Sequence, residues 1–224
     1  MKPSYLPKPL YWLFVLVIFL GSFALRMVDI DDLPLDFHPT RQLFSALKVR
    51  GMYYENVPDI PEWQREMAVQ QWKTQPTLEP EFIEYMTLIA YVQKGDADLA
   101  LPRQITAIFW VVSGFFLFLA ARRLVSPDGA LLTASFYLFL PYTVYASRSF
   151  QPDPLMVAFI AAFIWALAGW LDERKWRWVI LTGFFGGLAI LMKVVAIFFI
   201  AGAALVAILQ KMSLKKAFNN AQVW

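Results

Sequence analysis

Two side chains that can transfer protons lie two positions apart near the start of the chain. Asp36 is an acid, and His38 is the only histidine among the 224 residues. A carboxylate can take a proton from an attacking hydroxyl or amine, and a neutral imidazole can do so near its usual pKa of about 6.5. Either residue is therefore a candidate general base, although a single acid or histidine in a loop more often has no catalytic role.

Five more charged residues lie close to the ends of predicted helices and are candidates for binding an anionic substrate. They are Glu79, Arg103, Arg148, Asp153 and Lys193. Simpler explanations exist, because an acid beside a proline can favour a helix start and an arginine can anchor a helix at the lipid headgroups. Their placement by the surrounding helices decides between these interpretations.

The segment after His38 predicts an amphipathic helix that lies on a surface. Pro39 suits the first position of a helix, and Gly51 is a natural stop after its end. One side of this helix carries Leu43, Phe44 and Leu47, and the other carries Arg41, Ser45 and Lys48. We expect the polar side to face water while the helix lies on a bilayer.

The composition indicates a membrane protein. Hydrophobic residues make up 59% of the chain and charged residues 17%, with a mean hydropathy of +0.51, whereas soluble domains are nearer half apolar and a quarter charged. The sequence has no cysteine, which excludes disulfides, cysteine-based zinc sites and thiol nucleophiles. A net charge of +3 without a basic tract gives no reason to expect a nucleic-acid partner.

Six apolar runs are expected to span the membrane and to form an all-α, multi-span helical bundle. They cover residues 10–26, 105–121, 130–147, 154–171, 178–192 and 194–209. The first run is slightly short for a bilayer that needs about 20 residues, and Ser22-Phe23-Ala24 would also serve as the cleavage site of a signal peptide. A membrane span and a signal peptide both place the residues that follow outside the cytoplasm.

Residues 27–103 form a large first loop in which we expect further surface helices. One begins after Pro61 and another after Pro80, and Gly95 ends the second. The second has apolar residues at the spacing of one helix face, namely Phe82, Tyr85, Met86, Ile89 and Val92. It is too short to cross a bilayer alone, so we expect it to lie at the membrane interface.

The distribution of positive charge orients the runs. With the N-terminus inside, the short outer turns hold only Arg148 and Lys193. The inner segments then hold Lys2, Lys8, Arg122, Arg123, Arg174, Lys175, Arg177, Lys211, Lys215 and Lys216. This obeys the positive-inside rule and predicts both ends in the cytoplasm with loop 27–103 outside. The last residues, NNAQVW, lack a terminating signal, so we expect the chain to be truncated before another span.

Taken together, the acids and bases at the outer membrane face suggest a substrate with a charged head and a lipid tail, and Arg148 and Lys193 are the least easily explained otherwise. Cations in outer turns oppose the topological bias, and ionisable groups at membrane depth are usually functional. Arginine and lysine can neutralise a phosphate and stabilise it as a leaving group, while an acid takes the proton of the acceptor. A second acid could hold a divalent cation against the phosphate.

Five segments together carry a family resemblance. They are DFHPTRQLFSALKVRGMYY, LEPEFIEYM, LPRQITAIFW, AARRLVSPDGALLTASFYLFLPYTVYASRSFQPDPLM and GFFGGLAILMK. In this order the chain resembles polyprenyl-phosphate-sugar-dependent glycosyltransferases of the GT-C fold, especially bacterial protein mannosyltransferase-like and aminoarabinose-transferase-like enzymes. The resemblance covers essentially the whole chain, and it implies that later spans and part of the acceptor site are absent.

The resemblance also implies roles for single residues. Asp36 resembles the catalytic acid of the family by position, but relatives often have Asp-Glu where this chain has His38-Pro39. Both Asp36 and His38 therefore stay candidates for the base. Glu79 resembles an acid that helps to bind metal or phosphate in some relatives, which makes a divalent metal cation an expected cofactor.

Two further matches concern the outer ends of later spans. Asp153-Pro154 resembles an acid-proline pair at the outer end of the fourth span. Lys193 resembles a lysine that faces the carrier phosphate, although Met192 precedes it where threonine is usual. With Arg103 and Arg148, Lys193 is predicted to bind the donor phosphate.

Together with the topology, the resemblance implies an inverting glycosyltransferase in a bacterial cytoplasmic membrane, with its active site on the extracytoplasmic face. It would bind membrane lipid and move a sugar from a polyprenyl-phosphate donor to a protein, lipid or cell-surface glycan. Two alternatives stay open: a transporter or flippase-like protein that binds lipid headgroups, and a non-catalytic member of the same fold. The long loop and the lack of an internal repeat favour the enzyme.

Overall fold

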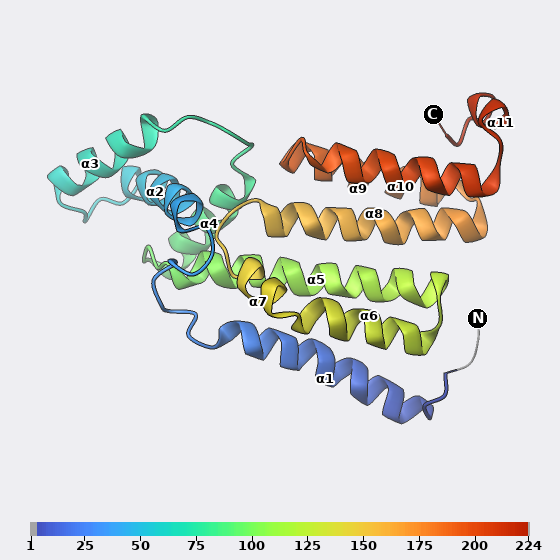
Figure 1. The fold of residues 1–224 in the computed structure, drawn as a ribbon. Coiled ribbons are helices and arrows are strands. Elements are labelled where there is room, and N and C mark those ends of the chain that lie inside the picture. Colours follow the sequence, from blue (N-terminus) through green and yellow to red (C-terminus); the bar gives the residue numbers. More distant parts are fainter. Residues whose placement is uncertain (1–3, 224) are drawn as a thin grey trace.

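The computed structural model describes residues 4–223, and every regular element in that range is a helix. Most of the long helices lie side by side as a bundle, and the helices of residues 39–94 gather at one end of it (Figure 1). The prediction of an all-α protein with surface helices in its first loop is therefore confirmed. Lys2, one of the predicted inner cations, lies outside the described residues.

The bundle consists of seven helices in chain order. They are α1 (Lys8–Met27), α5 (Ala100–Leu124), α6 (Pro127–Phe139), α7 (Pro141–Ser147), α8 (Asp153–Glu173), α9 (Trp176–Met192) and α10 (Ala196–Lys211). Helix α1 begins at the end of the bundle away from residues 39–94, and α11 (Leu214–Phe218) follows α10 at that same end (Figure 1).

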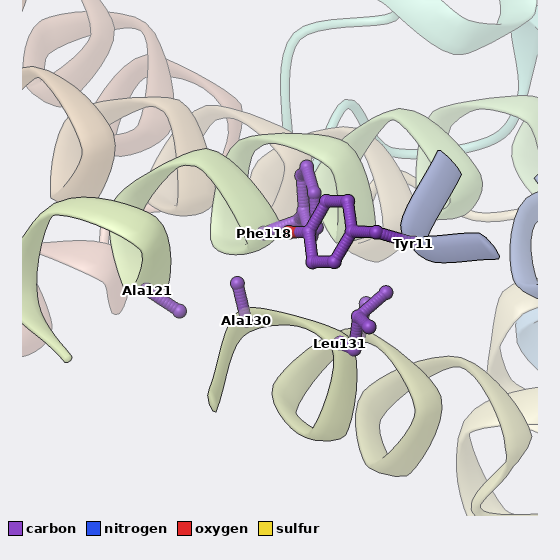
Figure 2. Packing of buried hydrophobic residues seen from close by; sticks show 6 residues of the cluster. Tyr11, Phe118, Ala121, Ala130 and Leu131 are labelled. Atoms are coloured by element: carbon purple, nitrogen blue, oxygen red, sulfur yellow. The ribbon is translucent and has the colours of Figure 1, made fainter. Parts of the chain in front are cut away.

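Small residues let the bundle helices approach closely. Buried alanines recur along α5, α6 and α8, as expected where lipid-embedded helices pack through van der Waals contact. A Cβ at Gly169 of α8 would lie 2.4 Å from the Trp178 ring of α9, so only glycine fits there. Near the other side of the bundle, Tyr11 and Phe118 meet above Ala130 and Leu131 (Figure 2).

Length and composition support membrane crossing for part of this bundle. Within the described range, α1, α5 and α8 are each long and apolar enough to span a bilayer. Helices α6 and α7 pass the same test as a pair, but they are bent by 63°. Helices α9 and α10 are apolar but have only 17 and 16 residues. The helices coincide closely with the six predicted runs, whose topology stays a prediction.

The bend between α6 and α7 interrupts the predicted run 130–147. Leu140 has an extended backbone, with φ −60° and ψ 128°, and Pro141 starts the next helix. The residue before a proline is pushed out of the helical region, and proline itself has no N–H to continue the helix. The bend turns α7 toward the helices of residues 39–94 (Figure 1).

The first loop contains the three expected surface helices. They are α2 (Pro39–Glu55), α3 (Glu62–Lys73) and α4 (Phe82–Lys94). As predicted, α2 begins at Pro39, and α4 ends at Gly95. Gly95 adopts the left-handed conformation, with φ 77°, that glycine tolerates at a helix end.

The prediction that Gly51 ends α2 is wrong. Helix α2 continues through Gly51 to Glu55. A Cβ at Gly51 would lie 2.4 Å from the Trp72 Cβ and 2.7 Å from the Ala68 carbonyl oxygen. The glycine is therefore needed for close packing of α2 against α3, a contact that local sequence signals do not reveal.

The expectation that the polar side of α2 faces water is also wrong. Ser45 and Lys48 are buried, whereas Leu43 is 44% exposed. Lys48 forms an ion pair with Glu81 at 2.6 Å, and Ser45 donates to Glu84 at 2.6 Å. The start of α4 thus supplies the partners that make burial of this polar side favourable.

Helix α4 places its apolar stripe outward. The five stripe residues from Phe82 to Val92 are exposed in the protein. The opposite side, with Ile83, Thr87 and Tyr91, is buried toward α2. We continue to expect the exposed stripe to contact lipid, since a bare apolar helix face is unfavourable in water.

Candidate functional site

A cleft of about 470 Å³ lies where the first loop, residues 27–103, meets the bundle. The first loop contributes Phe37, His38 and Arg41. The bundle contributes Trp110 from α5, Tyr142 and Ala146 from α7, Gln151, Asp153 and Val157 around the start of α8, and Lys193 after α9. The volume lies within the usual range for ligand sites, about 300–1,000 Å³.

Four charged side chains of alternating sign form a chain at this cleft. The Lys193 Nζ lies 3.0 Å from both carboxylate oxygens of Asp153 and 4.0 Å from Glu79 Oε1. The other oxygen of Glu79 accepts from Arg41 Nη2 at 2.6 Å. The side chains keep exposures between 21% and 32%, so a ligand from solvent can reach them. We call Arg41, Glu79, Lys193 and Asp153 the charged chain.

Local structure fixes two neighbouring members of the charged chain, Asp153 and Lys193. Asp153 begins α8, where a carboxylate interacts favourably with the positive end of the helix dipole. Lys193 follows the last residue of α9 and has an extended backbone, with φ −157°. Two sequence-predicted residues, Asp153 and Lys193, are thus brought together from positions 40 residues apart.

His38 and Asp36 occupy different places relative to the cleft. His38 lines it, and its backbone is left-handed, with φ 46°, which is uncommon for a residue other than glycine. Its carbonyl accepts the first helical N–H groups of α2, from Arg41 and Gln42. Asp36 does not line the cleft, but it directly precedes Phe37, which does. The carboxylate of Asp36 is 24% exposed.

The Asp36 carboxylate is held by three donors. Its Oδ2 pairs with Arg103 Nη2 at 3.1 Å. Its Oδ1 accepts from the Phe37 N–H at 3.0 Å and from Gln42 Nε2 at 3.3 Å. The orientation of this side chain is therefore set by α5 and α2 together.

Arg103 and Arg148, predicted to bind phosphate, lie behind the cleft. Arg103 has a side-chain exposure of 1% and donates to the carbonyls of Ile30, Asp32 and Arg148 as well as to Asp36. Arg148 donates to the Asp29 carbonyl at 2.6 Å. Both arginines tie the first loop to the bundle in this structure, while Lys193 is the predicted phosphate ligand that reaches the cleft.

Sequence reasoning missed several residues of the site. Arg41 was placed on a side facing water, yet it lines the cleft and bonds Glu79. Trp110 and Tyr142 also line the cleft, and neither they nor Gln42 received a role. The only available signal was that Arg41 and Gln42 lie within the same short motif as Asp36 and His38.

The expected divalent cation has no matching donor set around Glu79. Both Glu79 oxygens face cations, from Arg41 and Lys193. Within residues 4–223, no group of three or more acids or histidines is placed to hold a metal ion. Because arginine and lysine engage these carboxylates, the residues at the cleft do not fit a divalent cation.

A family profile decides what kind of protein carries this cleft. The profile described as dolichyl-phosphate-mannose-protein mannosyltransferase matches residues 78–223. The chain belongs to this family. The match confirms the predicted resemblance to GT-C glycosyltransferases and, with the apolar helices, indicates an integral membrane protein. It includes Glu79, Asp153 and Lys193 but begins after Asp36 and His38.

A curated relative gives a second, partial comparison. Lipid A galacturonosyltransferase RgtD of Rhizobium johnstonii is 26% identical to this mannosyltransferase-family chain over 149 residues. The alignment covers 62% of this chain and 31% of that protein, so the chain spans about a third of the length of the relative it matches. No solved structure matches the chain.

Proposed function

We propose that this protein transfers a sugar from a polyprenyl-phosphate donor to an acceptor outside the cytoplasm, with inversion at the sugar carbon. The charged chain in the cleft carries the proposal, because it places Arg41 and Lys193 at the end of a lipid-embedded bundle. A lipid-linked sugar phosphate needs the same arrangement, with its tail beside apolar helices and its anionic head against cations. Membership of a family named for a lipid-phosphate sugar donor supports this interpretation.

Each of the two cations at the cleft has an acid as its partner. Asp153 and Glu79 now hold Lys193, and Glu79 holds Arg41. A donor phosphate would take over part of these contacts. The two cations and the two acids already balance in charge, so the phosphate would compete with Asp153 and Glu79 for Lys193 and Arg41.

The chemical step is a single displacement. The acceptor oxygen or nitrogen attacks the anomeric carbon from the side opposite the phosphate. The bond between that carbon and the phosphate oxygen breaks, and its electron pair stays on the phosphate, where Lys193 and Arg41 stabilise it. A base next to the acceptor takes the proton, and Asp36 and His38 are the candidates.

Asp36 is the stronger candidate for the base. Its carboxylate is partly exposed, and three donors fix its direction. His38 lines the cleft directly, but it would act only while neutral. We therefore assign Asp36 as the base and keep His38 as the alternative.

The acceptor stays open within one class, a nucleophile exposed at the outer face of a bacterial cytoplasmic membrane. The family name refers to protein as acceptor, and the name of the relative refers to lipid A. Both kinds of acceptor would approach the cleft from outside the bilayer. Neither name assigns the acceptor of this chain.

Mass spectrometry of the intact protein purified in detergent tests the proposal. We expect a polyprenyl-phosphate sugar to co-purify, and we expect its sugar to be lost when membrane acceptor is added back. Lys193→Ala should reduce the bound lipid, and Lys175→Ala is the matched control. A bound headgroup lipid that is never consumed would instead favour the transporter or flippase-like alternative.

A further inference from the structure

Gln42 is a completely buried polar residue that the proposed reaction does not yet use. Its side chain has an exposure of 0%. The Nε2 atom donates to the Phe37 carbonyl at 2.6 Å and to Asp36 Oδ1 at 3.3 Å, with the Pro34 carbonyl at 3.4 Å. The Oε1 atom accepts the N–H of Phe150 at 3.0 Å. One amide group is thus bonded on both sides.

These bonds join two segments that are distant in the sequence. Phe37 and Asp36 belong to the turn before α2, whereas Phe150 lies 108 residues after Gln42 in the connection between α7 and α8. Asp153 begins α8 three residues after Phe150. Gln42 therefore joins the turn that holds the candidate base to the segment that leads into Asp153 at the cleft.

Among the common side chains of this length, only a glutamine amide satisfies both sides. Glutamate has acceptors alone, so it would lose the bonds to Phe37 and Asp36. Methionine fills a similar volume but offers neither a strong donor nor a strong acceptor. An unmade bond at a buried site costs the full desolvation of the group left without a partner.

We propose that Gln42 is a positioning residue that aims the Asp36 carboxylate and fixes its spacing from the phosphate-binding side of the cleft. The inference rests on the proposed function, with Asp36 as the base. It extends that function because Gln42 connects the base to the bundle by hydrogen bonds. One bond goes to Asp36, and the other comes from the N–H of Phe150. Gln42 itself touches no reacting atom.

Other charged groups surround the same carboxylate and must be kept constant in any test. Arg103 from α5 bonds Asp36, and Asp32 and Arg148 act electrostatically on Arg103. His38 follows two positions after Asp36, and Arg41 lies in the first turn of α2. A change at Gln42 alone leaves these five residues in place, so a shift in pH dependence reports on position 42.

The first test is the pH profile of kcat for Gln42→Glu in the intact protein. A second anion beside Asp36 disfavours its ionised form, so the acid limb should move upward by about one pH unit. The KM for the donor should stay within about twofold, because the charged chain is unchanged. Gln70→Glu makes the same chemical change at an exposed position of α3 and should leave the profile unaltered.

Gln42→Met keeps the proposal falsifiable if the glutamate variant does not fold. It removes the bond to Asp36 without adding charge, so we expect a smaller upward shift of the acid limb and a roughly tenfold lower kcat. A purely structural role would lower the amount of active protein and leave the pH profile of the remaining activity unchanged. A wild-type profile in every folded Gln42 variant would overturn the proposal.

A second test needs no transferase activity. Asp36→Cys places one thiol in a chain that otherwise has none, and its alkylation by N-ethylmaleimide across a pH series reports the pKa of that thiol. Adding Gln42→Glu should raise this pKa, because the introduced carboxylate faces the thiol, whereas adding Gln70→Glu should not. An equal pKa in all three proteins would overturn the positioning role.

The transfer activity of Asp36→Asn, compared with both tests, separates this inference from the assignment of the base. If Asp36→Asn retains transfer, the assignment of Asp36 as base fails, and the role of Gln42 in positioning a base fails with it. In that case a raised thiol pKa would still show that Gln42 faces position 36. If Asp36→Asn loses transfer and the Gln42 variants behave as wild type, only the present inference is wrong.

Discussion

The buried Arg103 forms an ion pair with Asp36, with its Nη2 atom 3.1 Å from the Asp36 Oδ2 atom. Arg103 comes from the first turn of α5, and Asp36 comes from the loop before α2. The same guanidinium donates to the carbonyls of Ile30 and Asp32. It therefore connects the segment that precedes α2 to the bundle. A candidate base in a long loop thereby gains the rigidity of a membrane-embedded helix, which catalysis requires of positioned groups.

Replacing Asp36 by asparagine should abolish sugar transfer while donor binding survives. Asparagine has nearly the same shape, but its amide cannot take the acceptor proton, whereas the cleft residues that face the donor are unchanged. A loss of about 10²–10⁴-fold is typical when a general base is removed. Transfer and donor binding should be measured on the same preparation of the intact protein.

His38→Gln provides the opposing comparison. Because Asp36 stays in place, we expect this change to cost much less activity than Asp36→Asn. If Asp36→Asn keeps activity and His38→Gln loses it, the base is His38. If neither change matters, the protein is better described as a non-catalytic member of its family.

Gly51→Ala should destabilise the packing of α2 on α3. The added methyl group would meet Trp72 Cβ and the Ala68 carbonyl well inside contact distance, and overpacking of this kind costs about 1–3 kcal/mol. Unfolding in mixed micelles measures the change. Gly187→Ala in α9 is the matched control, since a Cβ there meets nothing within 4 Å; an equal loss in both variants would contradict the packing argument.

Local patterns predicted the elements better than their contacts. The spacing of Phe82 to Val92 and the glycine at position 95 predicted α4 and its end, because both signals act within a few residues. The bend at Leu140 was also predictable from Pro141, but a continuous apolar run concealed it. The orientation of α2 was not predictable, since periodicity shows which residues share a side without showing which side is buried.

The candidate site shows the same division. Lys193 and Asp153 were recognised by charge and family resemblance, and the structure brings them together. The bonds of Arg103 to Asp36 and of Gln42 to Phe150 join residues 67 and 108 positions apart. Such pairings depend on how helices pack, and one sequence carries no signal for them.

Glu84→Gln should alter the pH dependence of stability. Burial raises the pKa of Glu84 above its ordinary value of 4.5, despite the hydrogen bond from Ser45 and the nearby Lys48. The folded protein therefore binds this proton more tightly than the unfolded chain. The resulting stabilisation is present below pH 4.5 and is lost as the pH rises through the higher folded pKa.

Glutamine at this position removes that loss, because it stays neutral and can still accept from Ser45. We expect Glu84→Gln to be at least as stable as wild type at pH 7 and to show a weaker decline of stability between pH 4 and 7. Unfolding at several pH values gives both curves. Glu66→Gln, on exposed α3, is the control, and parallel curves for Glu84→Gln and wild type would refute the effect.

The proposed topology places loop 27–103 outside and both ends of the chain inside. Single cysteines are informative because the sequence has none of its own. Cysteines introduced by Gln70→Cys in α3 and by Lys175→Cys between α8 and α9 should react with a membrane-impermeant reagent from opposite sides. Labelling of both from one side would show that the predicted alternation of the spans is incorrect.

Lys193→Ala and Arg41→Ala should both weaken donor binding. This result would show that the donor phosphate binds in the cleft. Each change removes a cation that faces the proposed phosphate, and a hydrogen bond to a charged group contributes about 1.5–3 kcal/mol. Because Asp153 and Glu79 compete for these cations in the free protein, we expect the lower end of that range, roughly a tenfold rise in Kd. Arg50→Ala and Lys175→Ala are the matched controls, since neither lines the cleft. A donor Kd that stays at the wild-type value in both cleft variants would show that the phosphate binds elsewhere.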